Sequence, residues 1–352
     1  MRLNLARLRN QGRRLLALPR GHELDRFATK SWQISPPSEA YRPPAIFPNG
    51  ELGRVRALSP WRNWDTERAL AVGGLVHHDP TFRHRFRDAT LFGSHLYAGG
   101  LKSLRGFGAE SWALGGNATV PHVELGALCS SEFGSAFFGT YLQYDFPLAL
   151  LCEGVGTPLR LRTLPMEHGD DYRHLAGLSP CAESDAVTVR ELTVFTDYAE
   201  NRGRSDRYIE LRNRMRKSLG GHRATTPYGA YIRRGHSGEL RVLQNEQQVE
   251  AILATRGFSI VDPTSMSARE ISQTIHGASV VVAVEGSHIS HCIFSMADSG
   301  TIVVLQPPAR FSMCYKEFTD CVDMRYAFLV CEPDGARFSA PIDRLQELLD
   351  GI

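Results

Sequence analysis

The sequence has almost no excess of charge of either sign: 40 lysines and arginines stand against 38 aspartates and glutamates, a formal charge of +2 over 352 residues. This balance gives no electrostatic case for nucleic acid as the main partner, because nucleic-acid-binding surfaces carry a basic excess. The sequence also lacks an apolar run long enough for a membrane-spanning helix. Its length and its apolar content of 42% are typical of a globular protein with two domains.

Cysteine motifs are missing as well, although the chain has seven cysteines. No two of them form a C-x-x-C pair, so neither a zinc ribbon nor a redox motif is indicated. Several lie in apolar surroundings, as small buried side chains do. We therefore expect the chain to reside in a reducing, cytoplasmic environment.

Several catalytic motifs are absent. No G-x-G-x-x-G follows a predicted strand, which removes the main signature of a dinucleotide cofactor. Neither a G-x-x-x-x-G-K-[ST] loop nor a G-x-S-x-G elbow occurs. There is also no D-x-D triplet, the usual carboxylate pair for a metal-bound nucleotide sugar. We expect neither a resident cofactor nor a bound metal ion.

Residues 1–62 are predicted to form an N-terminal arm. In residues 1–21 arginines and leucines are interleaved, without the apolar core and cleavage site of a signal peptide. This segment is either a basic amphipathic helix in weak peripheral contact with an anionic membrane surface, or a solvated or domain-docking first helix. Residues 21–62 are rich in proline and polar residues, which is typical of irregular structure.

Gly220-Gly221 is the predicted boundary between a first domain over 63–222 and a second domain over 223–340, and residues 341–352 are predicted to form a closing amphipathic helix. For the first domain the pattern predicts strands over 69–76, 89–98, 110–115, 158–164 and 187–195, and helices over 137–152 and 206–219.

The second domain has a clearer pattern. Strands are predicted over 228–234, 258–262, 279–285 and 301–307, with helices opening at Asn245 and Ser267 and a third helix over 287–297. The run 279–285 has no polar alternation, as expected of a strand that is covered on both faces. Right-handed crossovers in this β-α-β-α-β-α-β order require a parallel sheet with helices on both faces. We therefore predict a Rossmann-like domain.

Polar residues follow each predicted strand of this domain, at the edge of the sheet where ligands bind. They are Arg233, Arg234, Asp262, Glu285, Gly286, Ser287, His288 and Gln306. The two arginines, together with Arg241 in the next turn, suit a phosphate or diphosphate. Gly286 lets a ligand approach the backbone, and the N–H groups of a helix beginning at Ser287 favour an anion. The alternative is that Arg233 and Arg234 are solvent-facing surface charges.

His288 and His291 lie on one face of the predicted helix. Zinc needs at least three protein ligands, and Glu285 is the only neighbouring candidate for a third, so a metal site is disfavoured against a satisfied or solvent-facing histidine pair. His288 lies at the positive end of the helix, which favours the neutral imidazole and hydrogen-bond donation to a sugar or nucleotide.

Over residues 187–307 the sequence resembles glycosyltransferase family 61, including its bacterial members of the capsular polysaccharide biosynthesis type. The shared pattern begins with a strand that ends in arginines and continues through Arg233, Arg234, Arg241, Asn245-Glu246, Gly257-Phe258 and Ala278. The family turn His-Gly-Ala-Gly-Leu-Thr-Asn is matched by EGSHISH at 285–291. Glu285 therefore stands at the place of the family histidine, and His291 at the place of the asparagine.

The resemblance implies two Rossmann-like domains that face each other across a cleft (the GT-B arrangement), with the acceptor on the side of 63–222. It implies a hexosyl- or pentosyltransferase that moves a sugar, with inversion, from a nucleotide sugar to a glycan acceptor in surface or capsular polysaccharide synthesis. The expected donor-binding residues are Arg233, Arg234, Arg241, Asn245, Glu246, Gly286, Ser287, His288 and His291. Asp145 or Glu285 is expected to be the base that takes the acceptor proton.

Two other functions remain open. One is a catalytically silent protein that binds nucleotides or glycans on the same fold, which the replaced histidine makes plausible. The other is an oxidoreductase with a nucleotide cofactor, against which the missing glycine fingerprint argues.

Overall fold

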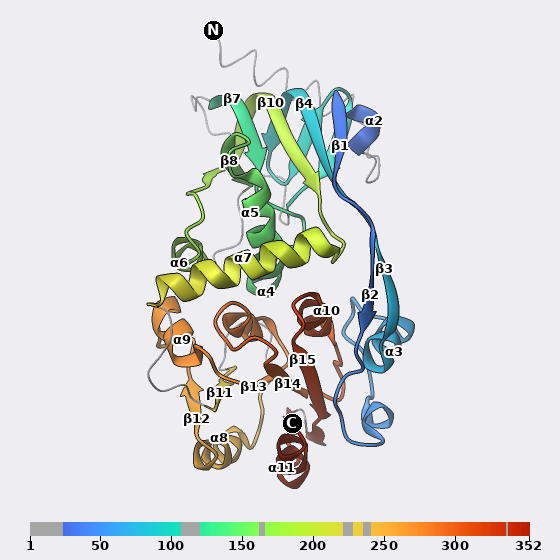
Figure 1. The fold of residues 1–352 in the computed structure, drawn as a ribbon, viewed down its shortest axis with the longest axis vertical. Coiled ribbons are helices and arrows are strands. Elements are labelled where there is room, and N and C mark those ends of the chain that lie inside the picture. The colour runs from blue at the N-terminus through green and yellow to red at the C-terminus, as the bar shows by residue number, and fades with distance from the viewer. Residues whose placement is uncertain (1–23, 107–119, 162–165, 221–227, 235–240, 336) are drawn as a thin grey trace. The chain divides into compact units, whose positions relative to one another are not determined.

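The computed structural model describes residues 24–106, 120–161, 166–220, 228–234, 241–335 and 337–352 (Figure 1). The chain divides into two compact units. Unit 1 takes its described residues from 1–37 and 79–207, and unit 2 takes its described residues from 38–78 and 208–352. The predicted domains 1–62, 63–222, 223–340 and 341–352 remain predictions.

Unit 1 is built on a mixed sheet with the strand order β6-β5-β4-β10-β7-β8-β9, in which β1 also pairs with β4. Strand β4 is antiparallel to β1, β5 and β10, whereas β10, β7, β8 and β9 run parallel. The strands are β1 (Lys30–Ser35), β4 (Thr81–Phe92), β5 (His95–Ala98), β6 (Leu101–Leu104), β7 (His122–Leu128), β8 (Thr157–Leu161), β9 (Ala182–Ser184) and β10 (Ala186–Thr196).

Short helices accompany this sheet. They are α2 (Leu24–Phe27), α4 (Phe138–Thr140), the π-helical turn η2 (Tyr141–Asp145), α5 (Phe146–Cys152) and α6 (Gly169–Leu175). The longer helix α7 (Arg202–Ser218) begins in unit 1 and ends in unit 2. The buried side chains of unit 1 include Phe86 and Leu91 of β4 and Leu192 of β10, so the two longest strands form the centre of its core.

The predictions for the first domain are confirmed in part. Strand β10 confirms the strand over 187–195, and α4, η2 and α5 together confirm the helix over 137–152. The strand over 69–76 is wrong in its first half, because residues 69–72 lie in helix α3 (Trp64–Val72), whereas residues 74–76 lie in strand β3 (Gly74–His78). Asn63 caps this helix by accepting the backbone N–H of Thr66 at 2.9 Å. The strand over 110–115 lies outside the described residues.

Unit 2 contains a parallel sheet with the order β12-β11-β13-β14-β15, the 2-1-3-4-5 order of a doubly wound fold. Its strands are β11 (Gly229–Ile232), β12 (Phe258–Val261), β13 (Val280–Val284), β14 (Thr301–Gln306) and β15 (Arg325–Val330). All five residues of β13 are buried, which confirms that this strand is covered on both faces. The last strand, β15, is an addition to the four that the sequence predicts.

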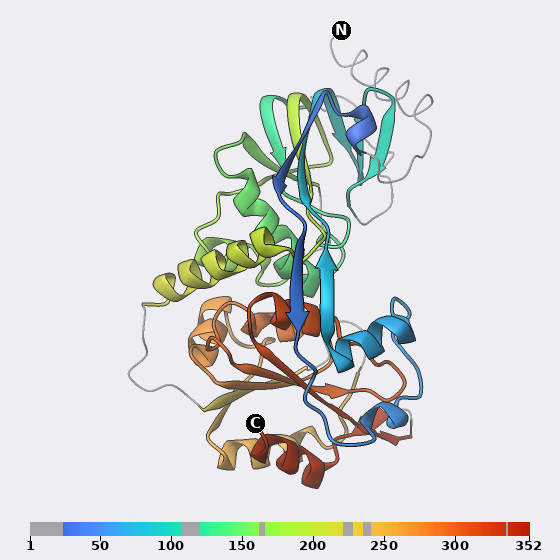
Figure 2. The same ribbon diagram turned by 45° about the vertical axis from the view of Figure 1, so that its right-hand side comes forward.

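Helices cover both faces of this sheet (Figures 1 and 2). The helices are α8 (Glu246–Thr255), α9 (Ala268–Ile275), the 3₁₀ helix η3 (Ser287–Cys292), α10 (Cys314–Cys321) and α11 (Ile342–Asp350). Helices α8 and α11 pack on one face, where Leu253 and Leu345 join the side chains of Val282 and Leu305 in one core cluster. Helices α9 and α10 lie on the other face (Figure 1). A short hairpin of β16 (Glu332–Asp334) and β17 (Arg337–Ser339) precedes α11.

Residues 38–78 belong to unit 2 although they precede most of unit 1 in the sequence. Besides α3 they form the antiparallel pair β2 (Ser38–Arg42) and β3 (Gly74–His78) and the 3₁₀ helix η1 (Glu51–Arg54). Ile46 forms a parallel bridge beside β15 by donating to the Tyr326 carbonyl at 2.9 Å and accepting from the Phe328 N–H at 3.0 Å.

Two buried glutamates hold the 38–78 segment in place. Glu51 accepts the backbone N–H of Val330 at 2.5 Å, and Glu67 accepts the backbone N–H of Met313 at 2.8 Å. Arg344 pairs with Glu51, and Arg62 with Glu67. Buried carboxylates are tolerated when they are paired and hydrogen-bonded, and both of these are.

The predicted α/β class is confirmed. The finer prediction of two Rossmann-like domains facing a cleft is not, because one side of the sheet in unit 1 is antiparallel. Among the helices that the structure describes, none is both long enough and apolar enough to span a membrane.

Candidate functional site

The strand order of unit 2 places a topological switch point between β11 and β13. From β11 the chain continues to β12 on one side of it, and from β13 it continues to β14 on the other. Open parallel sheets bind ligands in the crevice at the carboxyl ends of the strands that flank such a point. Arg234 follows β11 and Glu285 follows β13, and the register pairs Ile232 with Ala283, so both residues emerge at this edge.

Gly286 is the centre of the arrangement. Its φ of 147° and ψ of 173° belong to a region that side-chain-bearing residues rarely adopt. A Cβ atom at this position would overlap Arg234 Nη1 and would lie 2.8 Å from Arg241 Nη1. The missing side chain therefore allows two guanidinium groups to lie against the same backbone position.

Glu285 supplies a counter-charge to this pair. Its Oε2 lies 2.7 Å from Arg241 Nη1, and its carbonyl oxygen accepts a hydrogen bond from the same nitrogen at 2.9 Å. The pKa of Arg234 is lowered to about 10, first by burial and then by the Arg241 charge, and Glu285 opposes the shift. The Glu285 carboxylate thus offsets part of the repulsion between the two cations.

His288 is held as a neutral imidazole. Its Nδ1 lies 3.1 Å from Arg234 Nη1, and a guanidinium can only donate, so Nδ1 accepts and the proton is on Nε2. Burial lowers the pKa of His288 well below its ordinary value, and the Arg234, His291 and Arg241 charges act in the same direction. Among the described residues the buried Nε2–H has no hydrogen-bond partner, which leaves a donor for a ligand oxygen.

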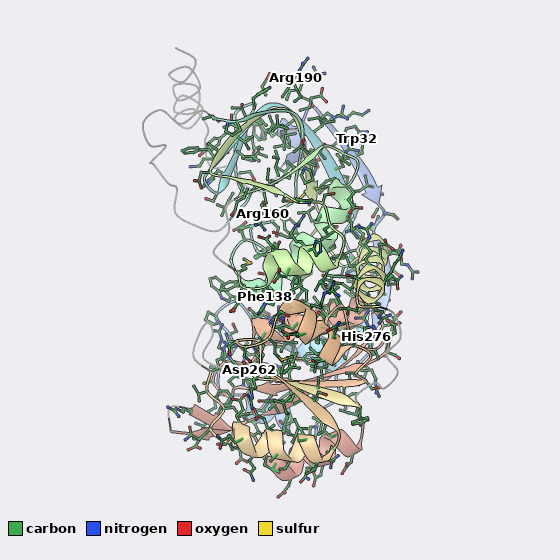
Figure 3. All side chains as sticks on the ribbon, turned by 90° about the vertical axis from the view of Figure 1, so that its left-hand side faces the viewer. Trp32, Phe138, Arg160, Arg190, Asp262 and His276 are labelled. Atoms are coloured by element: carbon green, nitrogen blue, oxygen red, sulfur yellow. The ribbon has the colours of Figure 1, made fainter. Side chains whose placement is uncertain are left out.

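Arg233 turns away from this pair. Its guanidinium forms two hydrogen bonds to the Glu250 carboxylate, at 2.5 and 2.6 Å, and lies 3.4 Å from Asp262, which is labelled in Figure 3. These hydrogen bonds, which Arg233 donates to Glu250, raise the pKa of Arg233 above its ordinary value. The two adjacent arginines that the sequence places together are therefore separated by the structure, as alternation along a strand requires.

Of the other predicted donor-binding residues, Asn245 and Glu246 are engaged elsewhere in unit 2, whereas His291 and Ser287 lie near His288 and Gly286. Asn245 exchanges two 2.9 Å hydrogen bonds with the backbone of Ala340, and Glu246 accepts the Tyr231 hydroxyl at 2.8 Å, so both connect elements of unit 2. His291 is buried close enough to influence His288. Half-buried Ser287 begins η3 directly after Gly286.

The helix predicted over 287–297 is wrong in type and length. Only Ser287–Cys292 is helical, as a 3₁₀ helix, because its N–H groups reach three residues back: Ile289 donates to Gly286 at 3.1 Å and Ile293 to Ser290 at 3.3 Å. An element this short provides little helix dipole, so side chains carry most of the positive charge at the site.

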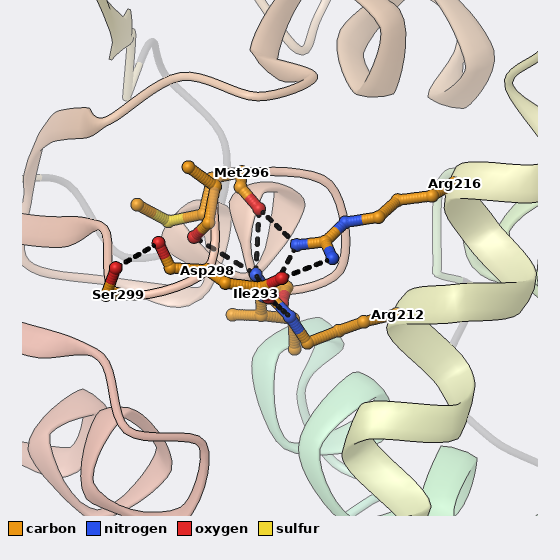
Figure 4. A network of polar contacts seen from close by, with 7 residues as sticks. Arg212, Arg216, Ile293, Met296, Asp298 and Ser299 are labelled. Atoms are coloured by element: carbon orange, nitrogen blue, oxygen red, sulfur yellow. Dashed lines mark hydrogen bonds and ion pairs between the residues drawn. The ribbon is translucent and has the colours of Figure 1, made fainter. Parts of the chain in front are cut away.

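Two arginines of α7 hold the far end of this segment, and the sequence analysis did not identify them (Figure 4). Buried Arg212 donates to the carbonyl oxygens of Ile293, Met296 (2.8 Å) and Ala297 (3.1 Å). Arg216 donates to Asp298 at 2.7 and 2.8 Å, and these bonds lower the pKa of Asp298 to about 2. The i, i+4 spacing of the two arginines on a predicted helix was the available signal.

The candidate base Asp145 belongs to unit 1, in the π-helical turn η2. Its Oδ1 accepts the backbone N–H of Ser131 at 2.9 Å and the Ser131 hydroxyl at 2.7 Å, and the carboxylate fills the place of a side chain on Gly134. Burial raises the pKa of Asp145 to about 7, and the two Ser131 bonds oppose this shift. A pKa near neutrality suits a general base, although this carboxylate is buried.

Within the part of the chain that the structure describes, no three His, Cys, Asp or Glu side chains are grouped as metal ligands. His288 and His291 do not alter this, since Arg234 occupies Nδ1 of His288.

Two guanidinium groups at the switch point of a doubly wound sheet are an arrangement that suits an anionic ligand. The model of the family described as glycosyltransferase 61 matches residues 44–304. The match covers most of the sequence and parts of both units, so the chain belongs to glycosyltransferase family 61. No curated protein matches the chain.

The Arg212 contacts predict that the variants Arg212→Ala and Arg216→Ala differ strongly in their free energy of unfolding. Arg212→Ala removes a buried guanidinium from three backbone carbonyls, and we expect it to lower the free energy of unfolding by about 3 kcal/mol. Arg216→Ala, the matched control, removes a more exposed pair and should cost about 1 kcal/mol or less. Denaturant unfolding measures both values, and an equal loss for the two would contradict the role given to Arg212.

The pKa of Asp145 predicts a pH dependence of stability. The carboxyl is protonated in the folded state up to about pH 7 and ionises near pH 4 when unfolded, so its stabilising contribution is complete at low pH and is lost as pH rises through this window. Relative to Asp145→Asn, the wild-type free energy of unfolding should fall by ~1.4 kcal/mol per pH unit between about pH 5 and pH 7. Parallel pH profiles of the two proteins would show this prediction to be wrong.

Proposed function

We propose that this glycosyltransferase binds the phosphate of its nucleotide-sugar donor at the carboxyl ends of β11 and β13. The observation that carries the proposal is the approach of the Arg234 and Arg241 guanidinium groups to the bare α-carbon of Gly286. Hydrogen bonds to charged groups contribute ~1.5–3 kcal/mol each, so a few of them suffice for micromolar binding of a nucleotide. The Nε2–H of His288, which has no hydrogen-bond partner in the part of the chain that the structure describes, adds a neutral donor for a phosphate or sugar oxygen.

The proposed reaction is an inverting displacement. The acceptor hydroxyl oxygen forms a bond to the anomeric carbon on the face opposite the phosphate, and the bond from that carbon to the phosphate oxygen breaks. The electron pair of the broken bond stays on the phosphate, where negative charge grows. Arg234 and Arg241 stabilise this charge more strongly in the transition state than in the bound donor, which is the condition for catalysis.

The proton of the acceptor hydroxyl needs a base, and Asp145 and Glu285 are the candidates. Asp145 has a suitable pKa but its Oδ1 is bound by Ser131, and the Glu285 carboxylate is bound by Arg241. These engagements favour a second candidate function, a catalytically silent protein that binds nucleotides or glycans on the same fold. Nucleotide binding without sugar transfer to any glycan acceptor would support the silent protein, and turnover would exclude it.

We also propose more specific features of this function and of the protein. They are hexosyl or pentosyl transfer into a surface or capsular polysaccharide, a GT-B arrangement in which unit 2 binds the donor, no metal requirement, and a cytoplasmic location. The N-terminal arm is a candidate for weak membrane contact, but residues 1–23 lie outside the described residues. All seven cysteines are free thiols, which supports a reducing location.

The separation of the two adjacent arginines predicts different effects of their removal. Arg234→Gln should weaken nucleotide-sugar binding at least tenfold, because its guanidinium lies at Gly286. Arg233→Gln should change the affinity less than threefold, since Glu250 and Asp262 already bind its guanidinium. Titration calorimetry with the donor selected from a thermal-shift panel of nucleotide sugars measures both affinities. Equal losses, or no binding by the wild type, would contradict the proposed site.

A further inference from the structure

Three cationic side chains lie against the indole ring of Trp32 in unit 1. The register of β1 and β4 pairs Trp32 with Arg83 and Lys30 with Arg85, and because side chains alternate along a strand, all four lie on one face of the sheet. Lys30 Nζ lies 4.8 Å from the centre of the indole ring, and the guanidinium carbons of Arg83 and Arg85 each lie 5.3 Å from it. Cation–π contacts with one ring therefore gather these charges into what we call the Trp32 cluster.

Little negative charge balances the Trp32 cluster. Among the described residues, the carboxylate in ion-pair range of its cations is that of Glu191, whose Oε2 lies 3.6 Å from Arg85 Nη1. At this distance the contact is too long for a hydrogen bond. The pKa of Arg83 is lowered, first by burial and then by the Arg85 charge, so the two arginines still repel each other. The cluster thus keeps a net positive charge.

The N–H groups of the two arginines are available to a ligand. The Nε atoms of Arg83 and Arg85 are buried and have no hydrogen-bond partner in the described parts of the chain, and neither guanidinium donates a hydrogen bond to a described residue. The Arg85 side chain is 36% exposed and Lys30 is exposed, so a ligand can reach the cluster from solvent. Unpaired buried donors cost free energy, which hydrogen bonds to a ligand oxyanion recover.

The chemistry of the Trp32 cluster suits an oxyanion with paired oxygens. A guanidinium that stacks on an aromatic ring keeps its N–H edge fixed, and this edge matches a carboxylate or a phosphate. The nearly balanced charge of the whole chain disfavours nucleic acid. A membrane surface attracts flexible, fully exposed cations, whereas Arg83 and Arg85 are half-buried and held against Trp32. The ligand class that remains is an acidic carbohydrate.

Building on the sugar-transfer function proposed above, we propose that the Trp32 cluster binds acidic sugar units of the glycan acceptor, so that the acceptor is an anionic polysaccharide. The carboxylate of a uronic acid accepts hydrogen bonds from Arg83 and Arg85, and Lys30 adds positive charge at the exposed side of the cluster. A neutral sugar in the same place leaves both guanidinium groups without a partner and binds more weakly. Unit 1 thereby selects the acceptor by its charge.

The experiment compares a hexamer of galacturonic acid with its methyl ester, which has the same backbone without the charges. In titration calorimetry at low ionic strength and in about 0.15 M salt, wild type should bind the acid about tenfold tighter than the ester, or better. Arg83→Gln and Arg85→Gln should each weaken binding of the acid about fivefold or more. Trp32→Leu keeps every charge and should weaken it to a similar extent, because the guanidinium groups lose the ring that positions them.

Arg190→Gln is the matched control. Arg190 lies on β10 of the same sheet, on the face opposite to Glu191, and pairs with Glu124 at 3.1 Å; Figure 3 labels both Arg190 and Trp32. The control removes the same charge from an exposed ion pair and should leave the affinity within about twofold of wild type. Thermal unfolding of all these proteins shows whether a variant that binds weakly is still folded.

The proposal is overturned if wild type does not bind the acid, if it binds acid and ester equally, or if Arg190→Gln loses as much affinity as Arg85→Gln. Sedimentation with phosphatidylglycerol vesicles that depends on Arg83 and Arg85, without binding of the hexamer, would also overturn it and assign the cluster to a membrane surface. Nucleotide-sugar binding is measured on the same proteins: if it persists in these cases, the donor site of unit 2 stands. If wild type binds the acid in the predicted way but no nucleotide sugar, the cluster stands as a glycan-binding site and the donor site falls.

Discussion

Two positively charged groups that lie against one backbone position are the constraint on which the site of unit 2 depends. Guanidinium groups in this position repel each other and lose hydration, and both effects oppose folding. Three features of the sequence relieve this: a glycine makes room, a glutamate supplies charge, and a histidine accepts a hydrogen bond. Each is contributed by the residues that directly follow β13, so a single turn holds the whole arrangement. The neighbouring strands keep it in register.

Much of unit 2 could be predicted because the central strands of its parallel sheet, β11, β13 and β14, are buried on both faces. Such strands appear as continuous apolar runs, and the capping box of Ser267 and Glu270 marks the helix before β13. Unit 1 was harder. Its central strands β4 and β10 are long and antiparallel, and the partners of β10 on its two sides run in opposite directions. Nothing local in a strand specifies the direction of its neighbour.

At the candidate site the sequence predicts the position of the polar residues but not their contacts. The edge of the sheet that carries Arg234, Glu285 and Gly286 followed from topology alone. The partner of each side chain did not, because Arg233 meets Glu250 on α8 and Arg241 meets Glu285, which are far apart in the sequence. The same holds for Arg212, whose partners are backbone carbonyls more than 80 positions away. When an ionic side chain binds backbone groups, as Arg212 and Glu67 do, the residue type at the partner position carries no information about the contact.

Each of the two units combines two separate stretches of the chain, and this affects the order in which the units can fold during synthesis. Unit 2 needs residues 38–78 together with residues 208–352, whereas unit 1 is drawn from residues on either side of 38–78. During synthesis the 38–78 segment leaves the ribosome long before β11 to β15 exist, so Glu51 and Glu67 must wait for the backbone N–H groups of Val330 and Met313. Unit 1 can complete its sheet in that interval. Unit 2, which carries the candidate donor site, is therefore the last unit to complete its fold. Because the two units alternate along the sequence, truncating the chain at one position cannot yield either unit alone.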